Sequence, residues 1–254
     1  MKKHVALIMF ALIGFNAMAQ SDGKESKLHL GLIGLNSYGW MSTESKNISN
    51  GGIKAGVALG IYGDYYFAKN YAFTVELLHS TQGFKAKADS ILSFNSSSNE
   101  YLKSGGVTID YKMRSFQIPI TLKLRTNEIG YWRYFGQIGV APSFTYKAIK
   151  ADFSPNAFVR QDDNTDRLVN DAQNDFILND PQINPDNQSY FLEEDNVSGI
   201  RVPILIGAGA EWNLSGNTAL LFGLRYEYGL LNMMKAENTI GNRNVLSLAV
   251  GVRF

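Results

Sequence analysis

The chain contains no cysteine, and this absence excludes disulfide bonds, thiolate metal sites and a thiol nucleophile. Proline is also scarce, with six among 254 residues. After the N-terminal segment, no hydrophobic run approaches the about 20 residues that a membrane-spanning helix requires. No window carries the 3.6-residue apolar stripe that is typical of an amphipathic helix. The sequence therefore argues against helical architectures and against a fold held together by disulfides.

The N-terminal segment has the layout of a secretory signal peptide. MKKHVALIMFALIGFNAMAQ begins with two lysines, continues with a short apolar run and ends with an Ala-Met-Ala cleavage site. The apolar run is too short to span a bilayer, although a buried first helix is an alternative reading. We expect residues 1–19 to be removed, which leaves Gln20 as the mature N-terminus.

Acidic residues are concentrated in one segment of the chain. Residues 148–197 contain 11 acidic and three basic residues, a net charge of −8. Because the whole chain has a formal charge of +1, the remainder carries +9. A segment of this length and charge is unusual inside a compact domain, so we expect it to be a surface loop.

Apolar residues alternate with small or polar residues in eight segments, which is the period of a β-strand with one apolar face. In the last segment, Leu248 and Val250 lie on the apolar face, while Ala249 and Gly251 lie on the other. The eight segments are 28–36, 54–67, 71–80, 115–125, 131–147, 199–214, 218–229 and 244–254.

The connections between these segments alternate between short and long. The short ones are 68–70, 126–130 and 215–217, and the long ones are 37–53, 81–105, 148–197 and 230–243. In an up-and-down barrel, successive connections emerge at opposite ends. We therefore predict an all-β, eight-stranded antiparallel up-and-down transmembrane β-barrel over residues 28–254, with short periplasmic turns and long extracellular loops. Residues 20–27 would form a short periplasmic segment.

Two further features favour a membrane barrel over a soluble one, which would show the same alternation. A final strand that runs to the last residue suits a wall without edges, because unpaired backbone groups are costly in hydrocarbon. In addition, the apolar face becomes aromatic near the short turns, as expected at a membrane interface. These aromatic residues are Phe67, Tyr71, Phe73, Trp132, Tyr134, Trp212 and Phe254.

The opposite face of the strands carries charges of both signs, which we expect to pair inside the lumen. An eight-stranded barrel has an interior that side chains can fill, which argues against transport. On this basis we expect Arg201 to pair with Glu211, and Arg225 with Glu227. The other charged residues assigned to this face are Asp64, Glu76, Lys123, Arg125, Arg133, Lys147 and Arg253.

Several of these segments also resemble a known family. FQIPITLKLR, YWRYFGQIGVAPSFTYKA, VPILIGAGAEWNL and LLFGLRYEYGL are similar to the bacterial outer-membrane β-barrel domain family, which includes PorT-like and small porin-family barrels. VELLHSTQG resembles a strand motif of that family, with His79 where an aromatic residue is usual. The resemblance implies an outer-membrane location, and it implies that the barrel-assembly machinery recognises Phe254. It does not imply an activity, and no residue marks the chain as a secretion-associated member.

Two motifs invite a chemical interpretation, and neither is convincing. His79, Ser80 and Glu76 suggest a lipid hydrolase, but adjacent strand residues point to opposite faces, so His79 cannot activate Ser80. DDNTD (162–166) has the spacing of a calcium loop, but Arg167 and Gln173 replace its required Gly and Glu. We therefore expect no enzyme activity, and no catalytic, cofactor-binding or metal-binding residues.

The leading hypothesis is a non-enzymatic outer-membrane barrel that presents extracellular loops for structural, adhesive or interaction roles. The alternatives are an accessory component of a type IX-like protein secretion assembly and, as a distant third, an outer-membrane lipid hydrolase. The expected partners are outer-membrane lipid, the barrel-assembly machinery through Phe254, and an extracellular or secretion-system protein. We expect a monomer that does not bind nucleic acid.

The first prediction concerns processing and location. Because the signal peptide should be cleaved after Ala19, the mature protein is expected to begin at Gln20 and to fractionate with the outer membrane. N-terminal sequencing of protein from the separated membrane fractions tests both points. Recovery of the protein from the soluble periplasm would contradict this interpretation.

Overall fold

The computed structural model describes residues 27–43, 48–95, 100–154, 158–162, 165–169, 198–232 and 241–254. The expected signal peptide lies outside these residues. Within them, no helix is long and apolar enough to cross a membrane.

The described chain consists of antiparallel strands that belong to one sheet. The strands are β1 (Leu28–Thr43), β2 (Ile48–Gly52), β3 (Lys54–Ala68), β4 (Tyr71–Asn95), β5 (Glu100–Gln117), β6 (Ile120–Arg125), β7 (Trp132–Val140), β8 (Ser143–Ser154), β9 (Phe158–Asp162), β10 (Thr165–Val169), β11 (Ile200–Arg201), β12 (Ile204–Ser215), β13 (Thr218–Tyr228) and β14 (Gly241–Arg253).

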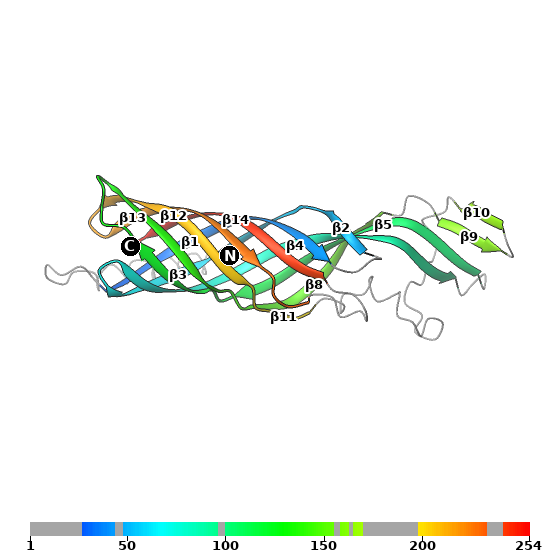
Figure 1. Ribbon diagram of the computed structural model, residues 1–254, viewed down its shortest axis with the longest axis horizontal. Coiled ribbons are helices and arrows are strands. Elements are labelled where there is room, and N and C mark those ends of the chain that lie inside the picture. The colour runs from blue at the N-terminus through cyan, green and yellow to red at the C-terminus, as the bar shows by residue number, and fades with distance from the viewer. Residues whose placement is uncertain are drawn as a thin grey trace, which may run out of the picture.

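These strands form eight barrel strands in a ring, as the sequence predicts. In chain order the eight are β1, β3, β4, β5 with β6, β7 with β8, β11 with β12, β13 and β14 (Figure 1). The ring closes where β14 pairs with β1, from Gly31 opposite Arg253 to Thr43 opposite Gly241. The amide of Phe254 donates to the Leu30 carbonyl at 2.8 Å, so the pairing continues to the last residue.

Three of the eight barrel strands are each interrupted by a proline, because proline has no N–H to donate to the ladder. The register continues unchanged across the interruptions, and each proline carbonyl still accepts a hydrogen bond from the next strand. Ile118 donates to Pro142 at 2.8 Å, and Ala141 donates to Pro203 at 3.0 Å. At the third interruption, the Pro119 carbonyl accepts a hydrogen bond from the Glu76 amide at 3.0 Å.

The short connections are tight turns, as expected, and they lie at the same end of the barrel as Phe254. Gly130 and Gly216 adopt positive φ angles of 65° and 56° in two of these turns. Glycine has no Cβ to clash in this conformation, which explains its use at both positions. We call this end of the barrel the turn end and the opposite one the loop end.

The connections expected to be long loops contain more strand than the sequence indicates. β4 and β5 continue as a hairpin ribbon from Leu78 opposite Gln117 to Asn95 opposite Glu100, through the segment expected as loop 81–105. β1 likewise extends to Thr43, and part of segment 148–197 is strand. Figure 1 shows the ribbon running beyond the barrel toward β9 and β10. Cross-strand pairing stabilises these extensions. Within the segment that was expected to be loop, Phe84 and Ala86 alternate with Lys85 and Lys87, which is a short strand pattern.

Side-chain exposure confirms the assignment of the two faces. Leu248 and Val250 are 53% and 54% exposed on the outer wall, whereas Ala249 is 2% exposed in the lumen. The outer wall of the other strands is apolar in the same way. An apolar surface of this extent is rare on soluble monomers, and it is the surface expected of a wall that faces lipid.

The second prediction tests the outer face at Leu248. Leu248→Arg should reduce folding into lipid vesicles, because a lipid-facing arginine near the midplane costs about 2–4 kcal/mol. Leu248→Asn should cost less, since it introduces no charge. The folded fraction is read from the gel shift between unheated and boiled samples. Ser247→Ala, on the inner face, is the control, and a larger loss for the control than for Leu248→Arg would show that the faces are reversed.

Candidate functional site

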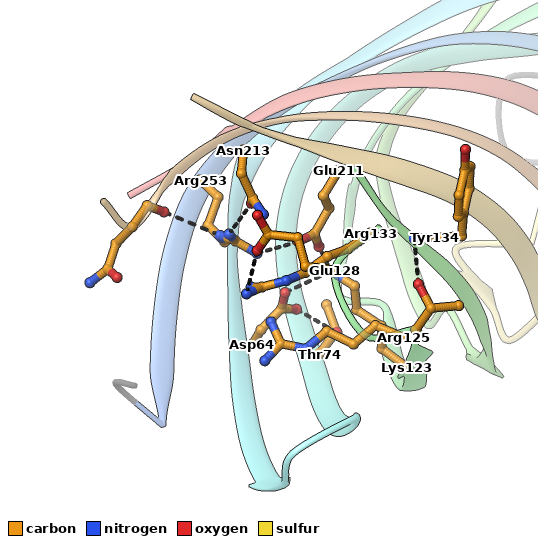
Figure 2. A network of polar contacts seen from close by, with 12 residues as sticks. Asp64, Thr74, Lys123, Arg125, Glu128, Arg133, Tyr134, Glu211, Asn213 and Arg253 are labelled. Atoms are coloured by element: carbon orange, nitrogen blue, oxygen red, sulfur yellow. Dashed lines mark hydrogen bonds and ion pairs between the residues drawn. The ribbon is translucent and has the colours of Figure 1, made fainter. Parts of the chain in front are cut away.

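The lumen near the turn end holds a buried charge network centred on Lys123. The ammonium group of Lys123 lies 2.8 Å from a carboxylate oxygen of Asp64 and also donates to Glu211. Thr74 donates to the other oxygen of Asp64 at 2.6 Å. All four side chains are buried, and Figure 2 shows them converging from different strands. Because one cation lies between two carboxylates, a second cation is needed for balance.

Arg253, on the last strand, supplies that second cation. Its guanidinium pairs with the remaining oxygen of Glu211 and donates to Asn213 Oδ1 at 3.0 Å. Its Nε donates to the Asn217 carbonyl in the adjacent turn at 3.3 Å. Arg253 therefore links the closing strand to β12 and to the β12–β13 turn (Figure 2).

Arg125 completes the network near the turn end with neutral partners. Its guanidinium carbon lies 3.8 Å from the centre of the Tyr66 ring, which is a cation–π geometry. The same guanidinium donates to the Lys69 carbonyl at 3.2 and 3.3 Å. The Tyr66 ring and the Lys69 carbonyl therefore both help to stabilise this buried cation.

An apolar layer separates this network from a second one. On β1 the layer lies between His29, near the turn end, and Ser37. On β14 it lies between Arg253 and Ser247. The side chains of the layer fill the interior of the barrel, as expected for eight strands. They are Ile33, Leu35, Ala58, Tyr62, Leu78, Phe135, Leu221 and Ala249.

The second network lies on the loop-end side of the apolar layer. Arg225 pairs with Glu76 at 2.7 Å, and Gln117 donates to Glu227 at 2.9 Å. Arg201 lies 3.7 Å from the other oxygen of Glu227. The second carboxylate oxygen of Glu76 and the amide oxygen of Gln117 are buried without a hydrogen-bond partner among the described residues. Buried water is the usual partner for such atoms.

The expected ion pairs were therefore wrong in their partners, although the residues do face the lumen. Arg201 pairs with Glu227 and not with Glu211, and Arg225 pairs with Glu76 and not with Glu227. Arg201 and Glu211 are ten residues apart on one barrel strand, or about 33 Å, which is too far for contact. Partners in a barrel come from neighbouring and facing strands.

Arg243 is a lumen cation that the sequence analysis missed. It is 2% exposed, and among the described residues it has no carboxylate partner. Its guanidinium donates to Gln82, which in turn donates to Ser37 at 3.4 Å, and Ser37 also accepts from Ser247 at 2.9 Å. The alternation of β14 begins at Gly241, three residues before the expected start, and reading it from there would have found Arg243.

The buried ionised side chains of the described lumen carry a small positive excess. The four acids are Asp64, Glu76, Glu211 and Glu227, and the six bases are Lys123, Arg125, Arg201, Arg225, Arg243 and Arg253, a difference of two. Two of the bases, Arg125 and Arg243, have the neutral partners described above.

Apolar residues close the lumen at the loop end. Phe84 and Tyr111 stack with ring centroids 5.0 Å apart, and both are fully buried. β1 and β4 approach closely here, since a Cβ on Gly39 would lie 2.6 Å from the Gly83 carbonyl oxygen. Met41 and Met113 are also buried. We call Met41, Phe84, Tyr111 and Met113 the apolar cap.

Two aromatic belts mark the outer wall. The belt at the turn end is confirmed, because Phe67, Tyr71, Phe73, Trp132, Tyr134, Trp212 and Phe254 are all 37% or more exposed. The belt at the loop end was not predicted, and it includes Tyr38, Trp40, His79, Phe116, Phe144, Tyr146, Tyr226 and Tyr228.

The spacing of the two belts fits a membrane. Tyr134 and Phe144 are ten residues apart, which is about 33 Å along the strand. A strand tilt of roughly 40° reduces this to about 25 Å, the height of the apolar band of outer-membrane barrels.

The structure separates the residues of the hydrolase hypothesis. His79 lies on the outer wall, where Nε2 is 2.8 Å from the Tyr146 hydroxyl. Ser80 is buried in the lumen, and its hydroxyl lies 2.7 Å from that of Ser115. Glu76 pairs with Arg225. The three groups therefore do not form a nucleophile–base–acid set.

In the calcium-loop motif, Asp162 ends β9 and pairs with Thr165 at the start of β10, while residues 163 and 164 lie outside the described residues. The side chains of the motif are not placed. Among the residues that are described, no group of three or more His, Cys, Asp or Glu side chains could hold a metal ion. The charged side chains brought together in the lumen pair with one another and with neutral groups, so their evident role is structural.

Comparisons with known proteins identify one family and several solved structures that this chain is similar to. The model of a family described as "Outer membrane protein beta-barrel domain" matches residues 18–235. Among solved structures, Neisserial surface protein A has 13% identity over 90% of this chain and 96% of that one, with a TM-score of 0.45. Ail of Yersinia pestis has 14% identity over 90% of this chain and 100% of its own chain, with a TM-score of 0.39. OprG of Pseudomonas aeruginosa has 9% identity over 88% of this chain and 96% of its own chain, with a TM-score of 0.37. No curated protein matches.

The third prediction tests the buried pair of Arg225 and Glu76. Arg225→Met leaves the Glu76 carboxylate buried without its cation and should destabilise the barrel by about 3–5 kcal/mol. Adding Glu76→Gln removes that charge and should restore most of the stability. Urea unfolding in lipid vesicles, followed by tryptophan fluorescence, measures both variants. A double variant as unstable as the single one would show that the two side chains are not coupled.

Proposed function

Because the chain belongs to the outer membrane protein β-barrel domain family, it is an outer-membrane protein, and we propose that it acts without catalysis by displaying a projecting sheet at the cell surface. The observation that carries this proposal is the β4–β5 ribbon, which extends beyond the barrel while the lumen below it is filled.

The filled lumen favours display over transport. A solute crossing the barrel would have to displace the apolar cap, two paired charge networks and the apolar layer. Separating buried ion pairs is costly, since each charge would lose its partner in a poorly solvated interior. The interior therefore fits a rigid support better than a passage.

The ribbon is long enough to reach well away from the membrane. From Gly83 and Lys112 to Asn95 and Glu100, about a dozen residues of each strand stay paired, or roughly 40 Å. An isolated two-stranded hairpin is marginally stable in water. Here β2 pairs with β4, and β9 pairs with β5, so additional strands support both edges.

The proposal places the turn end in the periplasm and the ribbon outside the cell. Outer-membrane barrels have short periplasmic turns and longer extracellular loops. Phe254 then lies at the periplasmic interface, 40% exposed, where the barrel-assembly machinery would meet it. The display role needs one barrel only, so we expect a monomer that contacts an extracellular or secretion-system protein through its ribbon.

The fourth prediction concerns a variant that lacks the outer part of the ribbon and keeps the barrel. Lys87 and Thr108 are cross-strand partners, so residues 88–107 can be replaced by Asn-Gly in the same register. The shortened protein should still fold and reach the outer membrane, because the barrel pairing is unchanged. Cross-linking of its surface partner on intact cells should be lost.

The matched control shortens a different connection at the same end, residues 233–240, and should retain the cross-link. A deletion strain complemented with each variant is also assayed for export of secreted proteins. Failed export that only the full-length ribbon restores would favour the accessory secretion role. Steady conductance of the purified barrel in planar bilayers would contradict the filled-barrel interpretation.

A further inference from the structure

The outer wall carries its loop-end cations on one side of the barrel. Among the described residues, outward-facing lysine and arginine side chains near this end occur on β4, β5 and β8, and none occurs on β1, β12, β13 or β14. Lys112, Arg114 and Lys147 are all exposed and lie together, and we call these three residues the basic patch.

The strand register brings two of these cations face to face. Arg114 lies directly opposite Lys147 in the β5–β8 ladder. The register shifts between Arg114 and Ser115, so Tyr146 is an extra residue in β8, and both Tyr146 and Lys147 face outward. Lys147 was expected in the lumen, and this bulge is the reason that it is not there. Like charges directly opposite each other are destabilising unless an anion lies between them.

No acidic side chain of the described residues pairs with the basic patch. The nearby acid on β5 is Asp110, and it pairs with Lys54. Among the side chains that the structure places, the patch therefore has no acidic partner. An anionic group from outside the protein is the natural counter-ion.

The height of the patch identifies where that anion comes from. Arg114 is two residues beyond Phe116, or about 7 Å along the strand, on the side away from the apolar band. Phe116, His79 and Tyr146 form an aromatic cluster, with ring centroids 5.4 to 6.0 Å apart. Because aromatic side chains lie at the boundary between hydrocarbon and headgroups, the patch lies at the level of the lipid headgroups.

We propose that Lys112, Arg114 and Lys147 bind the phosphate groups of an anionic lipid in the leaflet at the loop end. The guanidinium of Arg114 can donate two parallel hydrogen bonds to a phosphate, and the two ammonium groups add charge from either side. The aromatic cluster contacts the acyl chains below. This site is separate from the ribbon's partner and remains if the display role is wrong.

The test compares lipids that differ only in phosphate. The folded protein is placed in phosphatidylcholine nanodiscs that contain either diphosphorylated lipid A or its dephosphorylated glycolipid, and the lipid retained is titrated by native mass spectrometry. Each cation near an anionic surface contributes about five-fold in affinity, so Arg114→Gln with Lys147→Gln should weaken lipid A binding about 25-fold. The dephosphorylated glycolipid should bind all variants equally.

The matched control removes two exposed lysines at the turn end, with Lys27→Gln and Lys69→Gln, and should bind lipid A as the unaltered protein does. The gel shift on heating verifies that each variant is folded. Equal lipid A binding by the patch variant and the control would overturn the proposal. Displacement of lipid A by inorganic phosphate would also overturn it, since the site would then bind free phosphate and not a lipid.

Discussion

The closure of the wall between β1 and β14 is the constraint on which the rest of the structure depends. In hydrocarbon, an unpaired row of backbone N–H and C=O groups is prohibitively costly, so a sheet can cross a membrane only as a ring. The pairing continues to Phe254, the last residue. Once the ring is closed, every strand has one face toward lipid and one toward the lumen. The side chains on each face must then suit surroundings of opposite polarity.

The interior meets this requirement with layers. Charged residues gather in two networks, and an apolar layer lies between them. In each network the carboxylates are paired, and neutral groups contact one further cation. These groups are the Tyr66 ring and the Lys69 carbonyl for Arg125, and Gln82 for Arg243. This arrangement limits the cost of burying charge. It also makes the barrel a rigid support for whatever its loop end presents.

The loop end is asymmetric, and the same strands account for both of its distinctive features. β4 and β5 extend into the ribbon, and with β8 they carry the basic patch on the outer wall. The ribbon projects away from the membrane, while the patch lies at the level of the headgroups. A lipid bound at the patch would stay next to the barrel at the base of the ribbon. The opposite side of the wall, around Trp40 and Tyr226, is aromatic and uncharged.

The sequence alone determined the number of barrel strands, the positions of the tight turns and which side chains face lipid. These properties follow from period-two alternation and from the length of each connection, both of which are local. The separation of His79 from Ser80 followed from the same rule. Only the tertiary structure decided which charges pair, because the partners of Arg201 and Arg225 come from other strands.

Pairing between strands, which a local sequence pattern does not determine, also explains the ribbon and the basic patch. In the segment 81–105, Phe84 and Ala86 alternate with Lys85 and Lys87, but this stretch is too short to show how far the strand runs. The whole segment described is strand because β4 and β5 pair along their length. Lys147 faces outward because one extra residue in β8 reverses the alternation at Tyr146. A bulge is set by the register between two strands and leaves no mark in the sequence of either one. Local pattern therefore determined the wall of this barrel, and cross-strand register decided the chemistry on its two faces.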